Sequence, residues 1–155
     1  MRRKDREVTD LQQIRGVIER CKVARLGLVD EDGIYIVPMN FGYELTDGVL
    51  TLYFHCAKEG RRLSAIEKDS RVGFEMDCGH ELTEGPAARN YSFRYASIIG
   101  NGSARLVETP EEKLGALGRI MLHQTGKEFT FPAGAENAAA VIKVTADSFS
   151  CKQRA

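Results

Sequence analysis

Residues 23–56, VARLGLVDEDGIYIVPMNFGYELTDGVLTLYFHC, contain four β-rich segments and two turn signals. The segments VARLGLV and IYIVPMNFGY are joined by acidic residues 30–32 and by Gly33, which can adopt a positive φ. The Thr-Asp-Gly turn at residues 46–48 then joins YEL to the alternating segment VLTLYFHC. We therefore predict two consecutive β-hairpins.

Helical patterns lie on both sides of this region. Thr9 and Gln12 form a capping box, and apolar residues then recur at helical spacing, which predicts a helix over about residues 10–21. The segment EGRRLSAIEKDS, residues 59–70, has its apolar residues on one side and predicts a short helix of two to three turns. The strand-like segment RVGFEM follows directly.

The second half of the chain contains longer elements. Residues 77–90 mix glycine, proline and polar residues without a period, so we expect a loop there. The segment YSFRYASIIGNGSARLVE indicates a long strand that bulges or bends at residues 100–102. Thr109 caps a helix that ends near His123 and is terminated by Gly126, and AAVIKVTA forms a last strand.

This order of elements indicates a mainly β fold with peripheral helices. Six or more strands, mostly connected as hairpins, favour a closed or split antiparallel barrel over a parallel α/β sheet. The length of 155 residues and the 43% hydrophobic content suit one core. We therefore expect a single domain over residues 1–155.

The charge balance argues against several classes of partner. With 22 Lys and Arg against 22 Asp and Glu, the chain has no basic field that would attract nucleic acid or an anionic membrane. No segment approaches the roughly 20 apolar residues of a membrane helix, and no apolar segment follows the basic start. The four cysteines are scattered without a CxxC pair, which suits reduced thiols, so we expect a cytoplasmic protein.

The segment CAKEGRR, residues 56–62, is the most informative candidate for a ligand site. Lys58, Arg61 and Arg62 place three cations within five residues at the start of the predicted short helix, where the helix dipole disfavours positive charge. An anionic ligand would compensate, and a phosphate is the natural candidate for an arginine fork and a lysine. Solvated surface charge explains the same residues, so both interpretations stay open.

Two features of the neighbouring strands also point to a ligand. Pro38 lacks the amide that a strand ladder needs, which implies an edge strand where backbone groups and Asn40 could address a planar heterocycle. A plain edge strand explains Pro38 equally well. His55, just before the basic segment, either faces a substrate or is a half-buried barrel histidine.

The usual catalytic and metal motifs do not occur. The chain has no dinucleotide-binding, phosphate-loop or hydrolase motif. Cys78 and His80 lack a second pair at ligand spacing, so we expect no metal site. The lack of catalytic machinery fits a protein whose chemistry is carried by a cofactor.

Six segments together resemble the 5-nitroimidazole-resistance (Nim) family of the pyridoxamine 5'-phosphate oxidase-like superfamily. In chain order they are MRRKDREVTD, YIVPMNFGYE, LYFHCAKEGRR, VGFEMDCGHEL, YASIIGNGSA and LGRIMLHQTG, and they span nearly the whole chain. The resemblance implies a six-stranded antiparallel split β-barrel of Greek-key type that binds FMN. It also implies a homodimer with FMN at the subunit interface.

The resemblance further assigns residues to the two ends of the cofactor. His55 matches the family histidine near the flavin and the substrate, and Ser97 would close the site from the partner subunit. Cys56 and Met39 depart from the family, in which a small residue, often serine, and a leucine are usual. The isoalloxazine ring would be lined by Val37, Pro38, Met39 and Asn40, and the phosphate end would be held by Ala57, Lys58, Gly60, Arg61 and Arg62.

The activity implied by the resemblance is that of a flavin-dependent oxidoreductase, an FMN-dependent reductase of small planar acceptors such as nitro-heterocycles. His55 would orient the acceptor or supply a proton. The alternative is a protein that binds FMN or another phosphate-bearing ligand without significant turnover. Pyridoxamine-phosphate oxidase activity and nucleic-acid binding rank lower, the latter because the chain lacks a basic stripe with interleaved aromatic residues.

Overall fold

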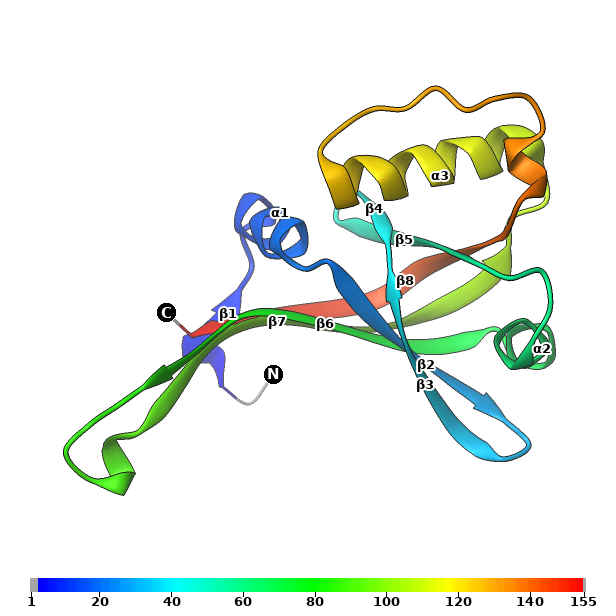
Figure 1. Ribbon diagram of the computed structural model, residues 1–155. Helices are drawn as coiled ribbons and strands as arrows, with labels where there is room; N and C mark the ends of the chain where they lie inside the picture. Colours follow the sequence, from blue (N-terminus) through cyan, green and yellow to red (C-terminus); the bar gives the residue numbers. More distant parts are fainter. Residues whose placement is uncertain (1–2, 155) are drawn as a thin grey trace.

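Eight antiparallel strands form one sheet in the computed structural model, which describes residues 3–154 (Figure 1). The mainly β class is confirmed, and the number of strands exceeds the expected six. The two-residue first strand is too short to show a pattern in the sequence. The strands are β1 (Glu7–Val8), β2 (Val23–Asp30), β3 (Gly33–Asn40), β4 (Gly42–Thr46), β5 (Val49–Cys56), β6 (Arg71–Thr83), β7 (Ser92–Leu106) and β8 (Ala140–Arg154).

Helices lie only at the periphery of this sheet. No helix within residues 3–154 has both the length and the apolar composition needed to cross a membrane. The α helices are α1 (Leu11–Arg20), α2 (Arg61–Lys68) and α3 (Pro110–Thr125), and the 3-10 helices are η1 (Lys4–Arg6), η2 (Ala88–Asn90) and η3 (Ala135–Asn137).

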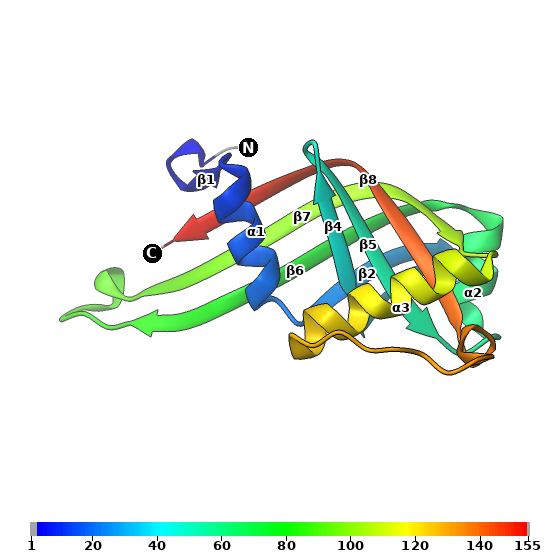
Figure 2. The same cartoon turned by 90° about the horizontal axis from the view of Figure 1, so that it is seen from above.

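The sheet is open, with the strand order β3-β2-β6-β7-β8-β5-β4 and β1 added to β8. Within the described residues no ladder joins the edge strands β3 and β4. The sheet nevertheless curls far enough for β3 to contact β5 across its interior (Figures 1 and 2). This open, curled arrangement is the expected split barrel.

Both predicted hairpins are confirmed. The β2 and β3 strands pair along their whole length, from Val23 with Asn40 to Asp30 with Gly33. Asp47 and Gly48, between β4 and β5, both have positive φ, 52° and 79°. Positive φ at both central residues is typical of the two-residue turns that match the twist of a hairpin.

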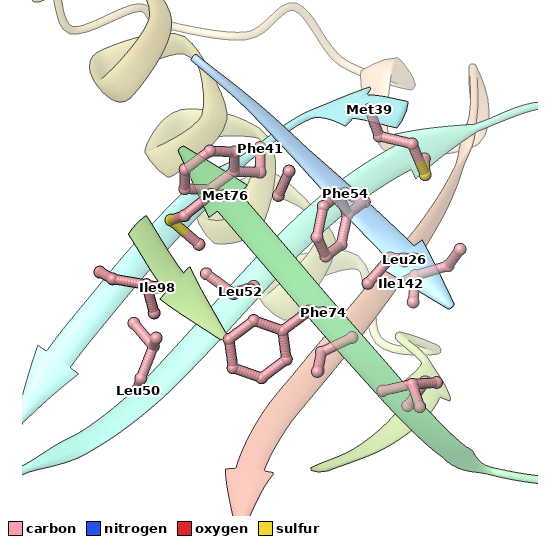
Figure 3. Close-up of a cluster of buried hydrophobic side chains, with 14 of the residues drawn as sticks. Leu26, Met39, Phe41, Leu50, Leu52, Phe54, Phe74, Met76, Ile98 and Ile142 are labelled. Carbon is pink, nitrogen blue, oxygen red and sulfur yellow. The ribbon is translucent and has the colours of Figure 1, made fainter. Parts of the chain in front are cut away.

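The core fills the inside of the curled sheet. Leu26, Phe54, Phe74 and Ile142 come from four different strands and point into the same interior (Figure 3). Each is at most 3% exposed. Burial of a side chain of this size contributes about 1.5–3 kcal/mol relative to exposure.

The helix α1 packs against β6 and β7 and adds Ile14, Val17 and Ile18 to the core. The predicted helix is confirmed, but its predicted cap is wrong. The side chain of Asp10, rather than Thr9, accepts a hydrogen bond from the amide of the third helical residue. Asp and Thr are both good N-cap residues, so adjacent candidates compete when only local sequence is considered.

The helix α3 covers the outside of β4 and β5. The helix begins after Thr109 and ends at Gly126, as the sequence predicts. The Thr109 side chain accepts a hydrogen bond from the Glu112 amide at 3.3 Å, and Gly126, with a φ of 73°, ends the helix in the left-handed conformation. Here the local signals at both termini were sufficient.

The prediction of a loop over residues 77–90 is wrong for its first half. The strand β6 continues to Thr83 and pairs with the start of β7, with an irregularity between Cys78 and Glu81. The two strands project from the barrel as a hairpin arm that ends near η2 (Figure 1). The glycine and polar residues hid this strand, because long-range pairing with β7 overrides local propensity.

The predicted irregularity at residues 100–102 is confirmed. The register of the β7–β8 ladder shifts between Asn101 and Gly102, and the extra residue lies in β8. A Cβ atom at Gly100 would overlap the ring of Phe74, so glycine permits a close approach there. The strand β8 is longer than predicted and ends at Arg154 because it continues to pair with β7.

Candidate functional site

The predicted basic segment lies where β5 ends and α2 begins. Gly60 precedes the helix with a φ of 134°, a conformation that favours glycine. A small cavity of about 80 Å³ opens at this turn. It is lined by Tyr35, Cys56, Ala57, Glu59, Gly60, Arg61, Arg62 and Leu63.

Arg62 has a buried donor without a partner. Its Nε atom is shielded from solvent and makes no hydrogen bond within the described part of the chain. Burial raises the pKa of the nearby Cys56 thiol, and the Arg62 guanidinium opposes this rise. A buried charged donor that lacks an acceptor is costly, so this atom marks a position that suits an anionic ligand.

Arg61 is already paired within the chain. Its guanidinium bonds to the Asp30 carboxylate through two nitrogens, and it lies 4.4 Å from the ring centroid of Tyr35. The Arg61 guanidinium holds the pKa of Asp30 below its usual value. Asp30 and Tyr35 belong to the site although the sequence interpretation missed them, since nothing in their local sequence connects them to residue 61.

Further donors lie in the same segment, although Lys58 does not line the cavity. Lys58 is exposed and forms no ion pair with any residue from 3 to 154. The amides of Leu63 and Ser64 bond to the Gly60 carbonyl, so the amides of Arg61 and Arg62 are the free donors of the first helical turn. The cavity thus offers one orphaned guanidinium nitrogen and two free amides, with the unpaired Lys58 beside it and the carboxylate of Glu59 in its lining.

The predicted ring-binding strand, β3, is an edge strand, as Pro38 implied. Its side chains alternate between two environments. Val37 and Met39 are each 8% exposed and belong to the core, whereas Pro38 and Asn40 face outward. The side chains of Val37 and Met39 therefore point away from an outer ligand, and because Pro38 has no N–H, the ladder bonds to β2 come from the backbone of Val37 and Met39.

Asn40 is held by the end of α3. Its side-chain amide donates to the Lys22 carbonyl at 3.0 Å and to the Gln124 side chain at 3.2 Å. The amide oxygen of Asn40 is then the polar side-chain atom left for a ligand.

His55 is exposed on β5 but does not line the cavity. In a strand, successive side chains point to opposite faces. His55 therefore lies on the face that carries Tyr53 and α3, while Cys56 points toward the cavity. His55 is therefore adjacent to the basic segment in the sequence, but its side chain lies on the face of β5 that points away from the cavity.

Ser97 is not brought to the basic segment within one chain. It lies in β7, and the strands β2 and β6 separate it from β3. It is opposite Asp77 of β6 and Lys152 of β8 on the outer side of the sheet. A role for Ser97 at a ligand bound near β3 would require a second copy of the chain.

The outer side of the sheet near β3 carries exposed apolar side chains. Ile34 and Ile36 are 79% and 63% exposed, and Val29 and Ile99 exceed half exposure. They surround a narrow band where Gly27 and Gly73 lie opposite each other. Exposed apolar residues grouped in this way are typical of an interaction surface.

Among residues 3–154, no group of three or more His, Cys, Asp or Glu side chains is arranged to hold a metal ion. His80 contacts the Asp77 carboxylate at 2.8 Å.

Comparison with known proteins gives the same fold and one closer likeness. A sequence profile of the family described as pyridoxamine 5'-phosphate oxidase matches residues 10–153. A crystal structure of a proposed 5-nitroimidazole antibiotic resistance protein from Bacteroides thetaiotaomicron VPI-5482 is 33% identical, with a TM-score of 0.81. The alignment covers 95% of this chain and 86% of that chain. A comparison with curated proteins found no match.

More distant structures share the fold alone. Flavocytochrome Anf3 from Azotobacter vinelandii is 19% identical, with a TM-score of 0.79 over 100% of this chain and 72% of that chain. The FAD and heme binding protein from Mycobacterium smegmatis is 16% identical, with a TM-score of 0.76 over 96% and 73% of the two chains.

Proposed function

The chain belongs to the pyridoxamine 5'-phosphate oxidase family, and we propose that it is an FMN-dependent reductase of small planar acceptors such as nitro-heterocycles. The observation that carries the proposal is the buried Arg62 Nε, which lacks a partner beside a cavity at the start of α2. Leaving such a donor unsatisfied costs about 1–3 kcal/mol or more, which an anionic ligand would recover. The likeness to the Bacteroides resistance protein supports the choice of acceptor.

The phosphate of FMN would bind to the donors of this segment. Arg62 would donate from Nε, and Lys58 would contribute a point charge. The free amides of Arg61 and Arg62 would add two donors at the positive end of the α2 dipole. Arg61 would contribute less charge, because Asp30 already neutralises it.

The isoalloxazine ring would lie along the free edge of β3. The strand advances about 17 Å between Tyr35, at the cavity, and Asn40, which gives room for an extended nucleotide. The outward face of Pro38 and the side-chain oxygen of Asn40 would bind and orient the ring. When bound, the flavin supplies the electron transfer, and the chain supplies position and shielding from water.

We also propose a homodimer that completes the site. The exposed Ile34, Ile36, Val29 and Ile99 support an interface on the outer side of the sheet, next to β3. Ser97 of a second copy would then approach the ring bound at β3.

Sedimentation tests the proposed dimer. The substitution Ile36→Glu should convert a dimer to a monomer and weaken FMN binding. If the wild-type protein is a monomer and still binds FMN with full affinity, the site is not shared between two subunits.

His55 is proposed to act on the acceptor rather than on the cofactor. Its side chain is exposed on the face of β5 opposite the phosphate cavity, so this role requires the acceptor to bind on that face, where His55 would orient it or supply a proton. We place the reaction in the cytoplasm, where the four free cysteines would remain reduced.

Anaerobic turnover with reduced FMN and a 5-nitroimidazole tests the reductase. The wild-type protein should reduce the acceptor faster than free reduced FMN does. His55→Ala should slow reduction by about 100-fold or more with unchanged FMN affinity, while the matched control His80→Ala should not. If the wild-type protein binds FMN without enhancing reduction, it is a flavin-binding protein without turnover. If His55→Ala turns over normally, His55 has no part in the mechanism.

A further inference from the structure

We propose that the chain has a second ligand site, between α1 and the C-terminal end of α3, which binds a small organic anion with an aromatic or apolar body. This inference is independent of the proposed flavin chemistry. Figure 2 shows the C-terminal ends of α1 and α3 side by side, and Figure 1 shows the same proximity. A cavity of about 600 Å³ lies there, a size typical of small-molecule sites. None of the residues predicted for FMN lines it.

The walls of this cavity carry an excess of positive charge. Arg15, Lys22 and Arg119 line it together with one carboxylate, that of Glu19. Arg119 is paired with Glu44, whereas neither Arg15 nor Lys22 has an ion-pair partner in the described chain. With Arg119 neutralised by Glu44, Arg15 and Lys22 exceed the Glu19 carboxylate by one positive charge.

The two cations without an ion-pair partner are held in place by backbone carbonyls. Arg15 donates to the Leu45 carbonyl at 2.8 Å, and Lys22 donates to the His123 carbonyl at 2.6 Å. A carbonyl fixes the side chain without neutralising its charge, and each cation keeps further N–H groups for a ligand. Cations held in position before binding lose less side-chain entropy when an anion binds.

The remaining walls suit a flat or apolar body. The His123 ring lies against Phe41, with centroids 4.6 Å apart, and meets the Tyr43 ring edge-on. Tyr43, His123 and the half-exposed Leu122 all line the cavity. A phosphate ion or acetate alone would leave these surfaces unused, which favours an aromatic carboxylate.

His123 adds one specific polar group. It is 9% exposed, and burial lowers its pKa, which favours the neutral ring. Its Nε2 lies 2.8 Å from the Cys21 carbonyl, which can only accept, so Nε2 carries the proton and Nδ1 keeps a lone pair. No described residue donates to Nδ1. The site thus pairs two cations with an acceptor that a hydroxyl or amine on the ligand can use.

Titration of the full-length protein with benzoate, followed by the amide NMR signals of Thr125 and Gly126, tests the site. Benzoate should produce saturable shifts, and the uncharged isostere benzamide should bind at least about tenfold more weakly. Arg15→Gln and Lys22→Gln should each raise the benzoate Kd by at least about tenfold, and the matched control Lys68→Gln, on α2, should not. Circular dichroism would establish that the variants are folded.

Three results would overturn the proposal. The first is that benzoate produces no saturable shift of these signals. The second is that benzamide binds to the wild-type protein as tightly as benzoate does, a result that can be obtained without any variant. Displacement of benzoate by added FMN would show instead that the cavity belongs to the flavin site.

Discussion

The guanidinium of Arg61 and the carboxylate of Asp30 form a two-point ion pair that joins the start of α2 to the end of β2. The adjacent Arg62 has an unpaired buried Nε. The two arginines should therefore differ in their importance for an anionic ligand, although the sequence presents them as equivalent.

We predict that Arg62→Gln raises the Kd for FMN by roughly 10- to 100-fold, the loss of a charge-assisted hydrogen bond worth about 1.5–3 kcal/mol. Arg61→Gln should raise it less than about tenfold, because Asp30 already compensates that charge. Quenching of FMN fluorescence measures both values. A larger effect of Arg61→Gln would mean that Asp30 releases Arg61 to the ligand.

The Asp30–Arg61 pair should also make stability depend on pH. The folded-state pKa of Asp30 lies below its usual value because Arg61 hydrogen-bonds the carboxylate. The pair therefore stabilises the fold above the ordinary aspartate pKa of about 4, and this contribution is lost as the pH falls through the lowered value.

Urea denaturation of the wild type and Asp30→Asn between pH 7 and pH 3 measures this effect. The difference in the free energy of unfolding should be largest near neutral pH and should begin to shrink as the pH falls below about 4. The other carboxylates titrate in both proteins, so their effect on the free energy of unfolding cancels when the variant is compared with the wild type. A constant difference across the range would exclude the ion pair as its cause.

The four cysteines should react in two classes. Cys21 and Cys151 are at most 2% exposed, and burial raises the pKa of the Cys151 thiol to about 11 and that of Cys21 further. Iodoacetamide at pH 8 should label Cys56 and Cys78 in the native protein and spare the buried pair. Peptide mass spectrometry gives the sites, with urea-unfolded protein as the fully labelled control.

Labelling also reports on the cavity. Because Cys56 lines it, saturating FMN should slow the reaction of Cys56 and leave that of Cys78 unchanged. Equal rates at Cys56 with and without FMN would place the ligand elsewhere.

Gly42 should tolerate no side chain. A Cβ atom there would lie 2.7 Å from the Arg119 carbonyl oxygen and would overlap the backbone of α3. Gly42→Ala should lower the free energy of unfolding by about 1–3 kcal/mol through separation of β4 from α3.

The matched control is Gly16→Ala in α1, where the nearest atom to a Cβ is 3.8 Å away. Alanine should stabilise this helical position by about 0.5–1 kcal/mol. Thermal unfolding of the two variants should therefore show shifts of opposite sign. A harmless Gly42→Ala would mean that β4 and α3 are not packed backbone to backbone.

The parts of the fold with strong local signals could be predicted from the sequence. Turn residues at 30–33 and 46–48, and the caps at Thr109 and Gly126, specify their conformations through their own side chains or positive φ. The extensions of β6 to Thr83 and of β8 to Arg154 could not be predicted, because their strands are stabilised by pairing with β7.

In the candidate site, too, the features with a local sequence signal could be predicted, and those that depend on long-range contacts could not. Lys58, Arg61 and Arg62 are adjacent in the sequence, and their clustering indicated an anion site. The ion pair with Asp30, the stacking of Tyr35 and the distinct environments of the two arginines depend on how β2, β3 and α2 meet. No local pattern contains that information.

The identity of the ligand that the purified protein carries or takes up tests the central claim most directly. The measurement is a visible absorption spectrum before and after addition of FMN, with mass spectrometry of whatever the denatured protein releases. Our account predicts a flavin spectrum, release of FMN, and less flavin bound by Arg62→Gln at the same FMN concentration. A wild-type protein that neither carries nor binds flavin would contradict the account.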